Sequence, residues 1–320
     1  MKKVLFINLN KFLNNNIKPF LRCFPNEIAL WNNYNFELTN SLQERKSNKY
    51  DYIVFYSENN NNALKYKAYS PFEFIGEIEN IEHRAVLHIG FESKTVVDYN
   101  NVYKKLFNEL PYRNFYFYYL QKDFNHKNFR NINFIPIIPH NFIGCDNEKI
   151  NYDFLSKNSP KKDAQIALIS SNSSYAKGHD LRNQFAKKIK EKLGNEIEIF
   201  GRGVKDFENK YKSMANFKYQ IIIENGVEEN YCSEKLVDCF LSESYPIYFG
   251  CPNVFDFFSK DSLSIIDINN FDESLDQINK IIKDDLFTKR YKNIKHEKLR
   301  CLNKYNIFNI IRNYCEDLNV

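Results

Sequence analysis

Ionisable and amide side chains gather in one stretch of the chain, between two apolar runs. The runs, "YQIII" (219–223) and "YPIYF" (245–249), have the composition of buried β-strands, and "SEKL" between them opens a helical pattern. The stretch carries these groups: Glu224, Asn225, Glu228, Glu229, Tyr231, Glu234 and Lys235. Loops that follow the strands of an α/β protein hold its ligand, so this stretch is a candidate binding loop.

A strand and a helix earlier in the chain place a second cation in a similar position. "AQIALIS" (164–170) predicts a strand, and "LRNQFAKKIKEKLG" (181–194) predicts a helix with Asp180 as its N-cap. Arg182 then lies in the first turn of one helix and Lys235 in the first turn of the next. A cation at this end opposes the helix dipole, at a cost of a few tenths to ~1 kcal/mol, unless an anion lies beside it. Either side chain could instead bend into water, but the pair favours a diphosphate site.

Three further side chains of this loop are candidates for holding the rest of a nucleotide. A carboxylate beside a phosphate site is the usual partner of ribose hydroxyls, which assigns Glu234 to the ribose. Asn225 and Tyr231 flank the loop and are candidate donor contacts. The alternative for Glu234 is to complement the helix dipole, and for the other two to form a turn and fill the core.

The elements that must position these residues follow an α/β pattern. In the first half, short β-rich apolar runs occur at 3–8, 50–57, 84–92, 115–120 and 132–139, and a helical pattern covers 98–110. In the second half, strands are expected at 164–170, 196–201, 219–223 and 245–249, with helices after the first and third of them. Alternation of this kind predicts parallel sheets covered by helices.

Length and linker composition divide the chain. At 320 residues two domains are expected, and the polar stretch at 145–164 is the best linker. We therefore predict domains at 1–150 and 151–300, followed by an amphipathic helix at 301–320. That helix is expected to pack on the body, although the basic segment before it leaves peripheral membrane contact open.

Composition excludes several classes of protein. The net charge of +5 comes from interspersed acids and bases, which is unlike the concentrated basic face of a nucleic-acid binder. Seven cysteines without a Cys-x-x-Cys pair and six scattered histidines indicate a reducing compartment and no zinc site. No run approaches the ~20 apolar residues that span a bilayer, and the start "MKKVLFINLNKF" is expected to be a strand and not a signal peptide. We expect a soluble or peripheral protein.

The loop at 219–252 resembles the donor-binding signature of glycosyltransferase family 10, the α-1,3-fucosyltransferases. The matching residues are Glu224, Asn225, Tyr231, Glu234, Lys235, Leu236, Pro246, Gly250 and Pro252. This sequence departs from the family pattern at Gly226, Ser233 and Cys251, and none of these changes removes a charge. The resemblance extends over the whole C-terminal half.

The first half resembles the family more loosely. "HIGFESKTVVDYNN" is similar to the family segment that carries the proposed catalytic base, and the matching residue is Glu92, near the end of a predicted strand. The family usually has a proline where this chain has Lys94. A carboxylate that only caps the next turn is the alternative for Glu92.

The resemblance implies a GT-B fold: two Rossmann-like domains that face each other across a cleft, with a C-terminal helix. It implies an inverting enzyme that transfers L-fucose from GDP-β-L-fucose to a hydroxyl of an acceptor glycan. The expected acceptor contains GlcNAc, is fucosylated in α-1,3 linkage and belongs to a surface polysaccharide, a lipopolysaccharide or a glycoprotein. No metal is obligatory, with an ion such as Mn²⁺ at most stimulatory. The expected location is the cytoplasm, with peripheral contact at the inner face of the membrane left open. Nucleic acid is not an expected partner.

Two other interpretations stay open. A GT-B glycosyltransferase with a different nucleotide-sugar donor would keep the same diphosphate contacts. A catalytically inactive, glycan-binding relative would bind the donor without transferring its sugar.

Overall fold

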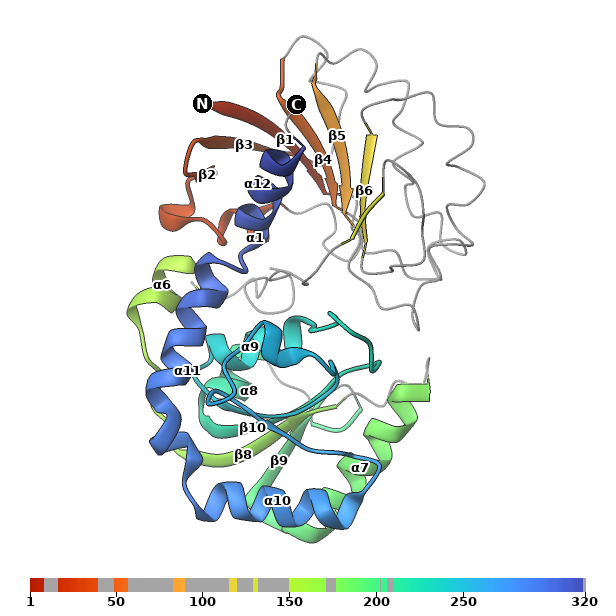
Figure 1. Ribbon diagram of the computed structural model, residues 1–320. Coiled ribbons are helices and arrows are strands. Elements are labelled where there is room, and N and C mark those ends of the chain that lie inside the picture. The colour runs from red at the N-terminus through yellow and green to blue at the C-terminus, as the bar shows by residue number, and fades with distance from the viewer. Residues whose placement is uncertain are drawn as a thin grey trace. The chain divides into compact units, whose positions relative to one another are not determined.

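The chain forms two compact units. The computed structural model describes residues 1–8, 17–39, 49–56, 83–89, 115–119, 129–131, 150–170, 177–201, 203–205 and 210–318. The first unit comprises Met1–Asn133 and Ile307–Val320, and the second comprises Phe134–Asn306 (Figure 1). The domain limits expected from the sequence stay a prediction. The last helix, α12 (Ile307–Asp317), packs within the first unit.

A seven-stranded sheet in the order β2-β3-β1-β4-β5-β6-β7 forms the centre of the first unit. Its strands are β1 (Lys2–Asn8), β2 (Leu30–Trp31), β3 (Tyr34–Thr39), β4 (Tyr52–Tyr56), β5 (Ala85–Ile89), β6 (Phe115–Tyr119) and β7 (Phe129–Asn131). Neighbouring strands are parallel except for the β2–β3 pair. This confirms four of the five predicted strands. The fifth, at 132–139, and the helix at 98–110 lie outside the described residues.

Aromatic side chains hold α12 on this sheet. The Phe308 ring lies 5.4 Å from Phe6 of β1, 5.0 Å from Phe36 of β3 and 4.0 Å from Phe24, measured between centroids. Burying one such ring stabilises the fold by ~1.5–3 kcal/mol. A hydrogen bond of 2.9 Å from the Tyr52 hydroxyl to the Cys315 carbonyl fixes the other end of the helix. The prediction that the C-terminal helix packs on the body is confirmed.

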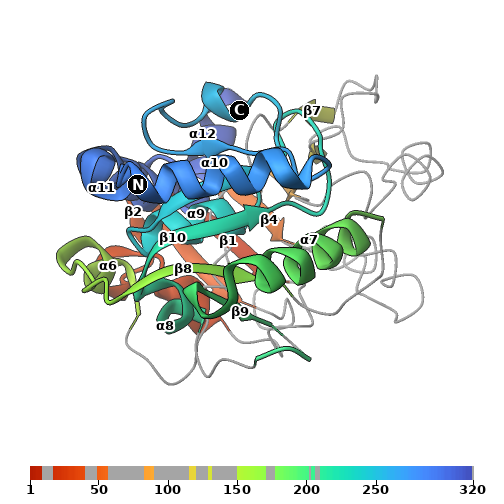
Figure 2. The same ribbon diagram turned by 90° about the horizontal axis from the view of Figure 1, so that it is seen from below.

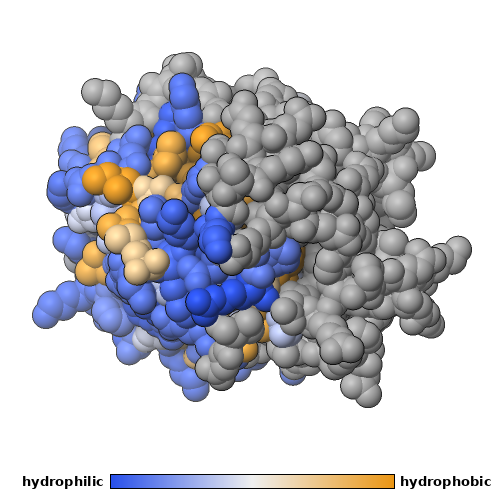
Figure 3. All heavy atoms as spheres, turned by 90° about the horizontal axis from the view of Figure 1, so that it is seen from above, coloured by the Kyte–Doolittle hydropathy of each residue, from blue (hydrophilic) through white to orange (hydrophobic). Residues whose placement is uncertain are grey.

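The short elements of this unit are α1 (Lys18–Leu21) and the 3-10 helix η2 (Pro25–Glu27). Figure 3 views the molecule from above relative to Figure 1, and the described surface on that face is mostly hydrophilic with smaller apolar areas. Large exposed apolar side chains of the first unit include Met1, Ile28 and Leu30. None of the helices among the described residues combines the length and the apolar character that crossing a membrane requires.

The second unit contains a five-stranded parallel sheet in the order β12-β11-β10-β8-β9. Its strands are β8 (Ala164–Ile169), β9 (Ile197–Phe200), β10 (Phe217–Ile223), β11 (Tyr245–Phe249) and β12 (Ser264–Ile265). Its helices are α6 (Tyr152–Lys157), α7 (Lys177–Leu193), η4 (Gly194–Glu196), α8 (Lys210–Ala215), α9 (Glu234–Leu241), η5 (Val254–Asp256), α10 (Phe271–Lys283) and α11 (Leu286–Asn303). All four strands predicted for this half are confirmed.

Helices cover both faces of this sheet. Successive side chains of a strand point to opposite faces, so neighbouring residues of β10 contact helices on opposite sides. On β10 the Tyr219 hydroxyl accepts a hydrogen bond of 3.2 Å from the Phe287 amide of α11. The next residue, Gln220, donates 3.2 Å to the Met214 carbonyl of α8. Figure 2 shows α7 running along β8 and β9. Strands buried on both faces explain the near-continuous apolar runs of the sequence.

The strand order reverses between β8 and β10. From β8 the chain crosses to β9 on one side, and it then continues to β10 on the other side. The loops that leave the carboxyl ends of these two strands therefore diverge, and ligands of doubly wound sheets bind at such a switch point. The loop after β8 leads to α7 and the loop after β10 leads to α9, so both candidate cations follow the switch strands.

The start of α7 differs from the prediction. The helix begins at Lys177, so Asp180 lies inside its first turn instead of capping it, and Arg182 is in the second turn. An acidic residue in the first turn complements the helix dipole from within, which explains why Asp180 is compatible with either position. Gly194 follows the last residue of the helix and has a φ of 54°, the left-handed conformation in which many helices end.

Candidate functional site

A buried carboxylate lies at the carboxyl end of β10. Glu224 is 2% exposed, and its Oε1 accepts hydrogen bonds from the Ser233 amide (2.8 Å) and the Tyr248 hydroxyl (3.4 Å). Its Oε2 accepts from the Ser233 hydroxyl (2.5 Å) and from Lys235 Nζ (3.4 Å). Burying a carboxylate is costly unless it is paired and hydrogen-bonded, and here both conditions are met.

Ser233 is the N-cap of α9 and brings Lys235 to the start of that helix. Its hydroxyl accepts hydrogen bonds from the Lys235 amide (3.3 Å) and from Lys235 Nζ (3.0 Å). A serine in this position contributes ~1 kcal/mol to the stability of a helix. The Lys235 ammonium also lies 3.8 Å from Glu234 Oε1. The predicted first-turn position of Lys235 is confirmed.

Arg182 approaches the same group of residues from α7. Its side chain is only 5% exposed, and Nη1 donates a hydrogen bond of 3.0 Å to Asn225 Oδ1. The Nε atom has no hydrogen-bond partner among the described residues. Burial lowers the pKa of the guanidinium, and the nearby Glu224 and Glu234 carboxylates counteract part of that shift. A buried cation with an unused N–H is suited to an anionic ligand.

The structure therefore brings together the predicted donor residues of the second unit. Asn225 contacts Arg182 directly, and Glu234 and Tyr231 both act electrostatically on the same guanidinium. Tyr231 is 2% exposed, so most of its ring belongs to the core. The predicted catalytic base, Glu92, lies outside the described residues.

Two residues that received no role from the sequence support this arrangement. The Tyr248 hydroxyl donates a hydrogen bond to Glu224 and accepts one of 3.0 Å from the Cys251 amide. Gly250 leaves room for the Glu224 side chain, since a Cβ at Gly250 would lie 2.4 Å from Glu224 Cγ. The signal for Gly250 was its place in the family signature, whereas nothing in the local sequence marked Tyr248.

The loop after β10 is also tied to the loop after β11. Asn253 accepts a hydrogen bond of 2.8 Å from the Asn230 amide and donates one of 2.9 Å to Asn230 Oδ1. Asn230 has a φ of 67°, a left-handed conformation that asparagine tolerates better than most residues. This double contact holds the end of the binding loop just before α9.

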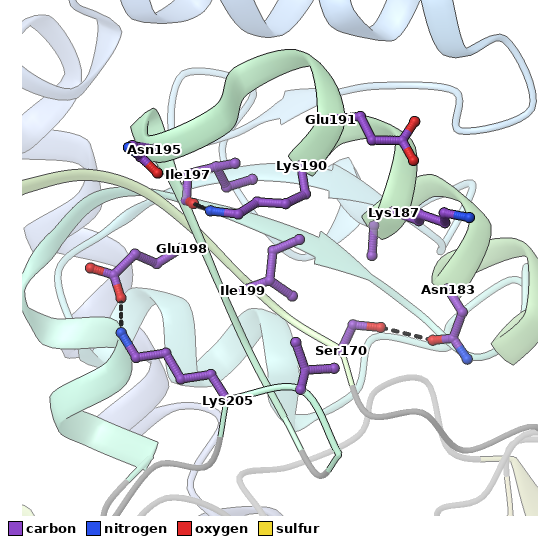
Figure 4. A pocket seen from close by; sticks show the side chains of 12 residues that line it. Ser170, Asn183, Lys187, Lys190, Glu191, Asn195, Ile197, Glu198, Ile199 and Lys205 are labelled. Atoms are coloured by element: carbon purple, nitrogen blue, oxygen red, sulfur yellow. Dashed lines mark hydrogen bonds and ion pairs between the residues drawn. The ribbon is translucent and has the colours of Figure 1, made fainter.

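A separate pocket of about 790 Å³ lies between α7 and β9 (Figure 4). Its lining residues are Ser170, Asn183, Ala186, Lys187, Lys190, Glu191, Asn195, Ile197, Glu198, Ile199, Val204 and Lys205. Two of its lysines are engaged by the protein itself: Lys190 donates to the Gly194 and Ile197 carbonyls, and Lys205 pairs with Glu198. None of the five donor residues lines it, so we assign the candidate site to the switch point and not to this pocket.

The described residues contain no group of three or more His, Cys, Asp or Glu side chains that could hold a metal ion. Among the described residues, two cations and two carboxylates lie together at the switch point: Arg182, Lys235, Glu224 and Glu234. Their chemistry is that of a site that neutralises an anion with side chains and a helix N-terminus.

One curated relative matches a part of this chain. A 71-residue stretch is 37% identical to the α-(1,3)-fucosyltransferase FucT of Helicobacter pylori; it covers 22% of this chain and 15% of that protein. The chain thus spans well under two thirds of the length of this relative.

The fold is shared with solved glycosyltransferase structures. A glycosyltransferase from Rickettsia africae ESF-5 superposes with a TM-score of 0.52 at 13% identity, over 98% of this chain and 97% of the other. Anabaena Alr3699/HepE, solved in complex with UDP-glucose, gives 0.52 at 10% identity over 100% of both chains. These similarities confirm the predicted GT-B type of α/β fold.

The model of the family described as "Glycosyltransferase family 10 (fucosyltransferase) C-term" matches residues 159–319, half of the chain. The match includes β8 to α12 and therefore every described residue of the switch-point site. The chain belongs to glycosyltransferase family 10, the fucosyltransferase family.

Proposed function

We propose that the protein is an inverting glycosyltransferase that moves L-fucose from GDP-β-L-fucose to a hydroxyl of an acceptor glycan. The observation that carries the proposal is the pair of cations at the switch point. Arg182 is desolvated with an unused Nε–H, and Lys235 lies at the N-terminus of α9, with Glu224 beside both. This arrangement suits the diphosphate of a nucleotide sugar.

The chemistry of the leaving group explains the need for two cations. When the bond between the sugar and the diphosphate breaks, negative charge develops on the departing GDP. Preorganised cations and N–H donors that face this charge lower the barrier, and a single such donor is typically worth ~2.7–4 kcal/mol. Arg182 and Lys235 would supply this stabilisation without an obligatory metal ion, so an ion such as Mn²⁺ would at most stimulate.

The nucleophile is the acceptor hydroxyl. In our proposal Glu92 takes its proton while the oxygen attacks the anomeric carbon from the side opposite to GDP. Attack from that side inverts the β-configured donor and gives an α-fucosyl bond. Glu234 would hold the ribose, Tyr231 would contact neighbouring donor groups, and Asn225 would support the sugar or the loop through Arg182.

The acceptor and the cellular location belong to the same proposal. The resemblance to α-1,3-fucosyltransferases favours a GlcNAc-containing acceptor of a surface polysaccharide, a lipopolysaccharide or a glycoprotein.

Such an acceptor fits an enzyme at the inner face of the membrane. The exposed Lys289, Lys292 and Lys295 of α11 suit contact with anionic headgroups. Co-sedimentation with vesicles that contain anionic lipid should exceed that with neutral vesicles; equal binding would remove the membrane part of the proposal.

Calorimetry and a transfer assay test the central claim. Purified protein is titrated with GDP and UDP and then incubated with GDP-fucose, other nucleotide sugars and GlcNAc-containing acceptors, with and without EDTA. We expect GDP to bind more tightly than UDP, fucose to be transferred in EDTA, and NMR to show an α linkage. If the protein turns over another nucleotide sugar and not GDP-fucose, that nucleotide sugar becomes the donor in place of GDP-fucose. Donor binding without transfer to any acceptor would favour the inactive relative.

A further inference from the structure

The buried carboxylate of Glu224 has no assigned role, although it touches the start of α9 at three points. We propose that Glu224 is a positioning residue of the donor site, which orients the Ser233 hydroxyl and thereby holds the Lys235 ammonium at the N-terminus of α9. The identity of the anion that Lys235 meets rests on the function proposed above. The contacts between the three residues do not.

The hydrogen bonds of Glu224 separate it from a substrate ligand. An ionised carboxylate offers about four lone-pair directions. Four donors within the protein use them: the Ser233 amide, the Ser233 hydroxyl, the Tyr248 hydroxyl and Lys235 Nζ. With its acceptor capacity filled and only 2% of its surface exposed, Glu224 has nothing left to offer a sugar hydroxyl. Its effect on a donor must pass through its neighbours.

The Ser233 hydroxyl transmits that effect. A hydroxyl has one proton and two lone pairs, and it rotates to suit its surroundings. Here the proton goes to Glu224 Oε2 at 2.5 Å, so the lone pairs are left for the Lys235 amide at 3.3 Å and Lys235 Nζ at 3.0 Å. The carboxylate thus decides which way the hydroxyl points. If the proton turned elsewhere, the helix cap and the lysine would lose their acceptor together.

Glu224 also supplies the countercharge that the site needs before an anion arrives. Its Oε2 lies 3.4 Å from Lys235 Nζ, and it is the leading group that opposes the loss of charge on the buried Arg182. Lys235 additionally sits at the positive end of the α9 dipole, which disfavours a cation there. Without the carboxylate, the ammonium is expected to move toward solvent and away from the position that meets the ligand.

Three substitutions test this inference. Glu224→Gln keeps the shape but places an N–H₂ donor against the Ser233 hydroxyl, so the hydroxyl proton must turn. Ser233→Ala removes the same relay, whereas Ser233→Thr keeps a hydroxyl. Glu229→Gln is the matched control, because Glu229 is an exposed carboxylate of the same loop.

Donor kinetics give the first readout. We expect Glu224→Gln and Ser233→Ala each to lower kcat/KM for the donor by about 10- to 100-fold, the loss expected for one charge-assisted hydrogen bond, mainly through KM. The double variant should be no worse than the more affected single variant, because both break one relay. Ser233→Thr and Glu229→Gln should stay within about twofold of the native protein. Additive losses in the double variant would overturn the proposal.

Chemical labelling of Lys235 gives a readout that needs no donor. Mild acylation followed by peptide mass spectrometry should modify Lys235 several-fold faster in Glu224→Gln and Ser233→Ala than in the native protein and Ser233→Thr. Equal labelling of the Ser233→Ala and Ser233→Thr variants would refute the positioning role, even if Glu224→Gln fails to fold. If the native protein binds no GDP, the proposed function fails, and the labelling result still decides the role of Glu224.

Discussion

Replacing Arg182 by methionine should separate binding from stability. Arg182 is 5% exposed and makes one hydrogen bond to Asn225 within the described residues, while its Nε has no partner there. Methionine has a similar length and flexibility and carries no charge, so it can fill the space without leaving a desolvated cation. The affinity for a diphosphate should therefore respond much more strongly than the stability of the unliganded protein.

The magnitudes follow from the contacts. Loss of a preorganised cation that faces the diphosphate should cost ~2–4 kcal/mol, which is about 30- to 1,000-fold in GDP affinity. The stability of the unliganded protein should change much less than the affinity, because two effects oppose each other. Methionine removes the desolvation cost of the guanidinium, but it also removes the cation near Glu224 and Glu234 and the donor to Asn225. A net change of about 1 kcal/mol in either direction would shift Tm by roughly 2–4 °C for a unit of this size.

Isothermal titration with GDP and thermal melts without ligand measure the two effects on the same preparations. Lys192→Met is the matched control, because it removes one exposed charge from the same helix. It should leave GDP affinity within about twofold, since exposed charges act weakly across solvent. An Arg182→Met protein that binds GDP like the native one, or a control that loses as much affinity, would refute the reasoning.

Three more changes test other parts of the molecule. Glu92→Gln should leave GDP affinity nearly unchanged and lower turnover by ~10²–10⁴-fold; a fully active variant would remove Glu92 as the base. Gly250→Ala should lower the free energy of unfolding in urea by ~1–3 kcal/mol, because its Cβ would lie 2.4 Å from Glu224 Cγ, and an unchanged midpoint would contradict that packing. Burial lowers the pKa of Lys162 from 10.5 to about 7. Between these values the unfolded state holds a proton that the folded state lacks, so the stability of the native protein relative to Lys162→Met should rise with pH, by up to ~1.4 kcal/mol per unit. If the difference in stability between the native protein and Lys162→Met stays constant from pH 7 to 10, the lowered pKa of Lys162 is refuted.

The types of the elements could be predicted because buried parallel strands leave a clear pattern. The runs at 164–170 and 219–223 are apolar and β-rich, and both form central strands. The predicted start of α7 was wrong, because Lys177 and Gly178 carry no apolar periodicity and the N-cap rule selects Asp180. Local rules compare neighbours in the sequence, and they locate the ends of a helix less precisely than its existence.

The strand order is a property that no local pattern contains. Nothing in the composition of the strands tells whether β8 pairs with β10 or with β11. The switch point that locates the site can be identified only once the order of the strands is known. The family signature selects the loop after β10 without this knowledge, because a diphosphate site needs its charged residues close together whatever the order of the strands.

The role of Glu224 could not be predicted for a different reason. A carboxylate that directly follows a strand can turn outward to a ligand or inward to the protein, and alternation along the strand does not extend into the loop. The inward direction depends on Gly250, which leaves the space, and on Tyr248, which supplies a donor from the next strand. Both lie more than 20 residues further along the chain, so only the fold reveals the contact.

The charges of the site explain why a mild net charge of +5 is compatible with binding a diphosphate. Two carboxylates, Glu224 and Glu234, lie beside the two cations, so the formal charges of the four groups cancel before a ligand binds. Within this group of four, attraction comes from direction rather than from net charge: Arg182 has an N–H that nothing within the described residues accepts, and α9 presents its N-terminal end. Directional donors in a mostly buried site are less screened by salt than a cationic surface. A site of this kind selects an anion by the positions of its oxygens, which is what the proposed transfer of a sugar from a diphosphate requires.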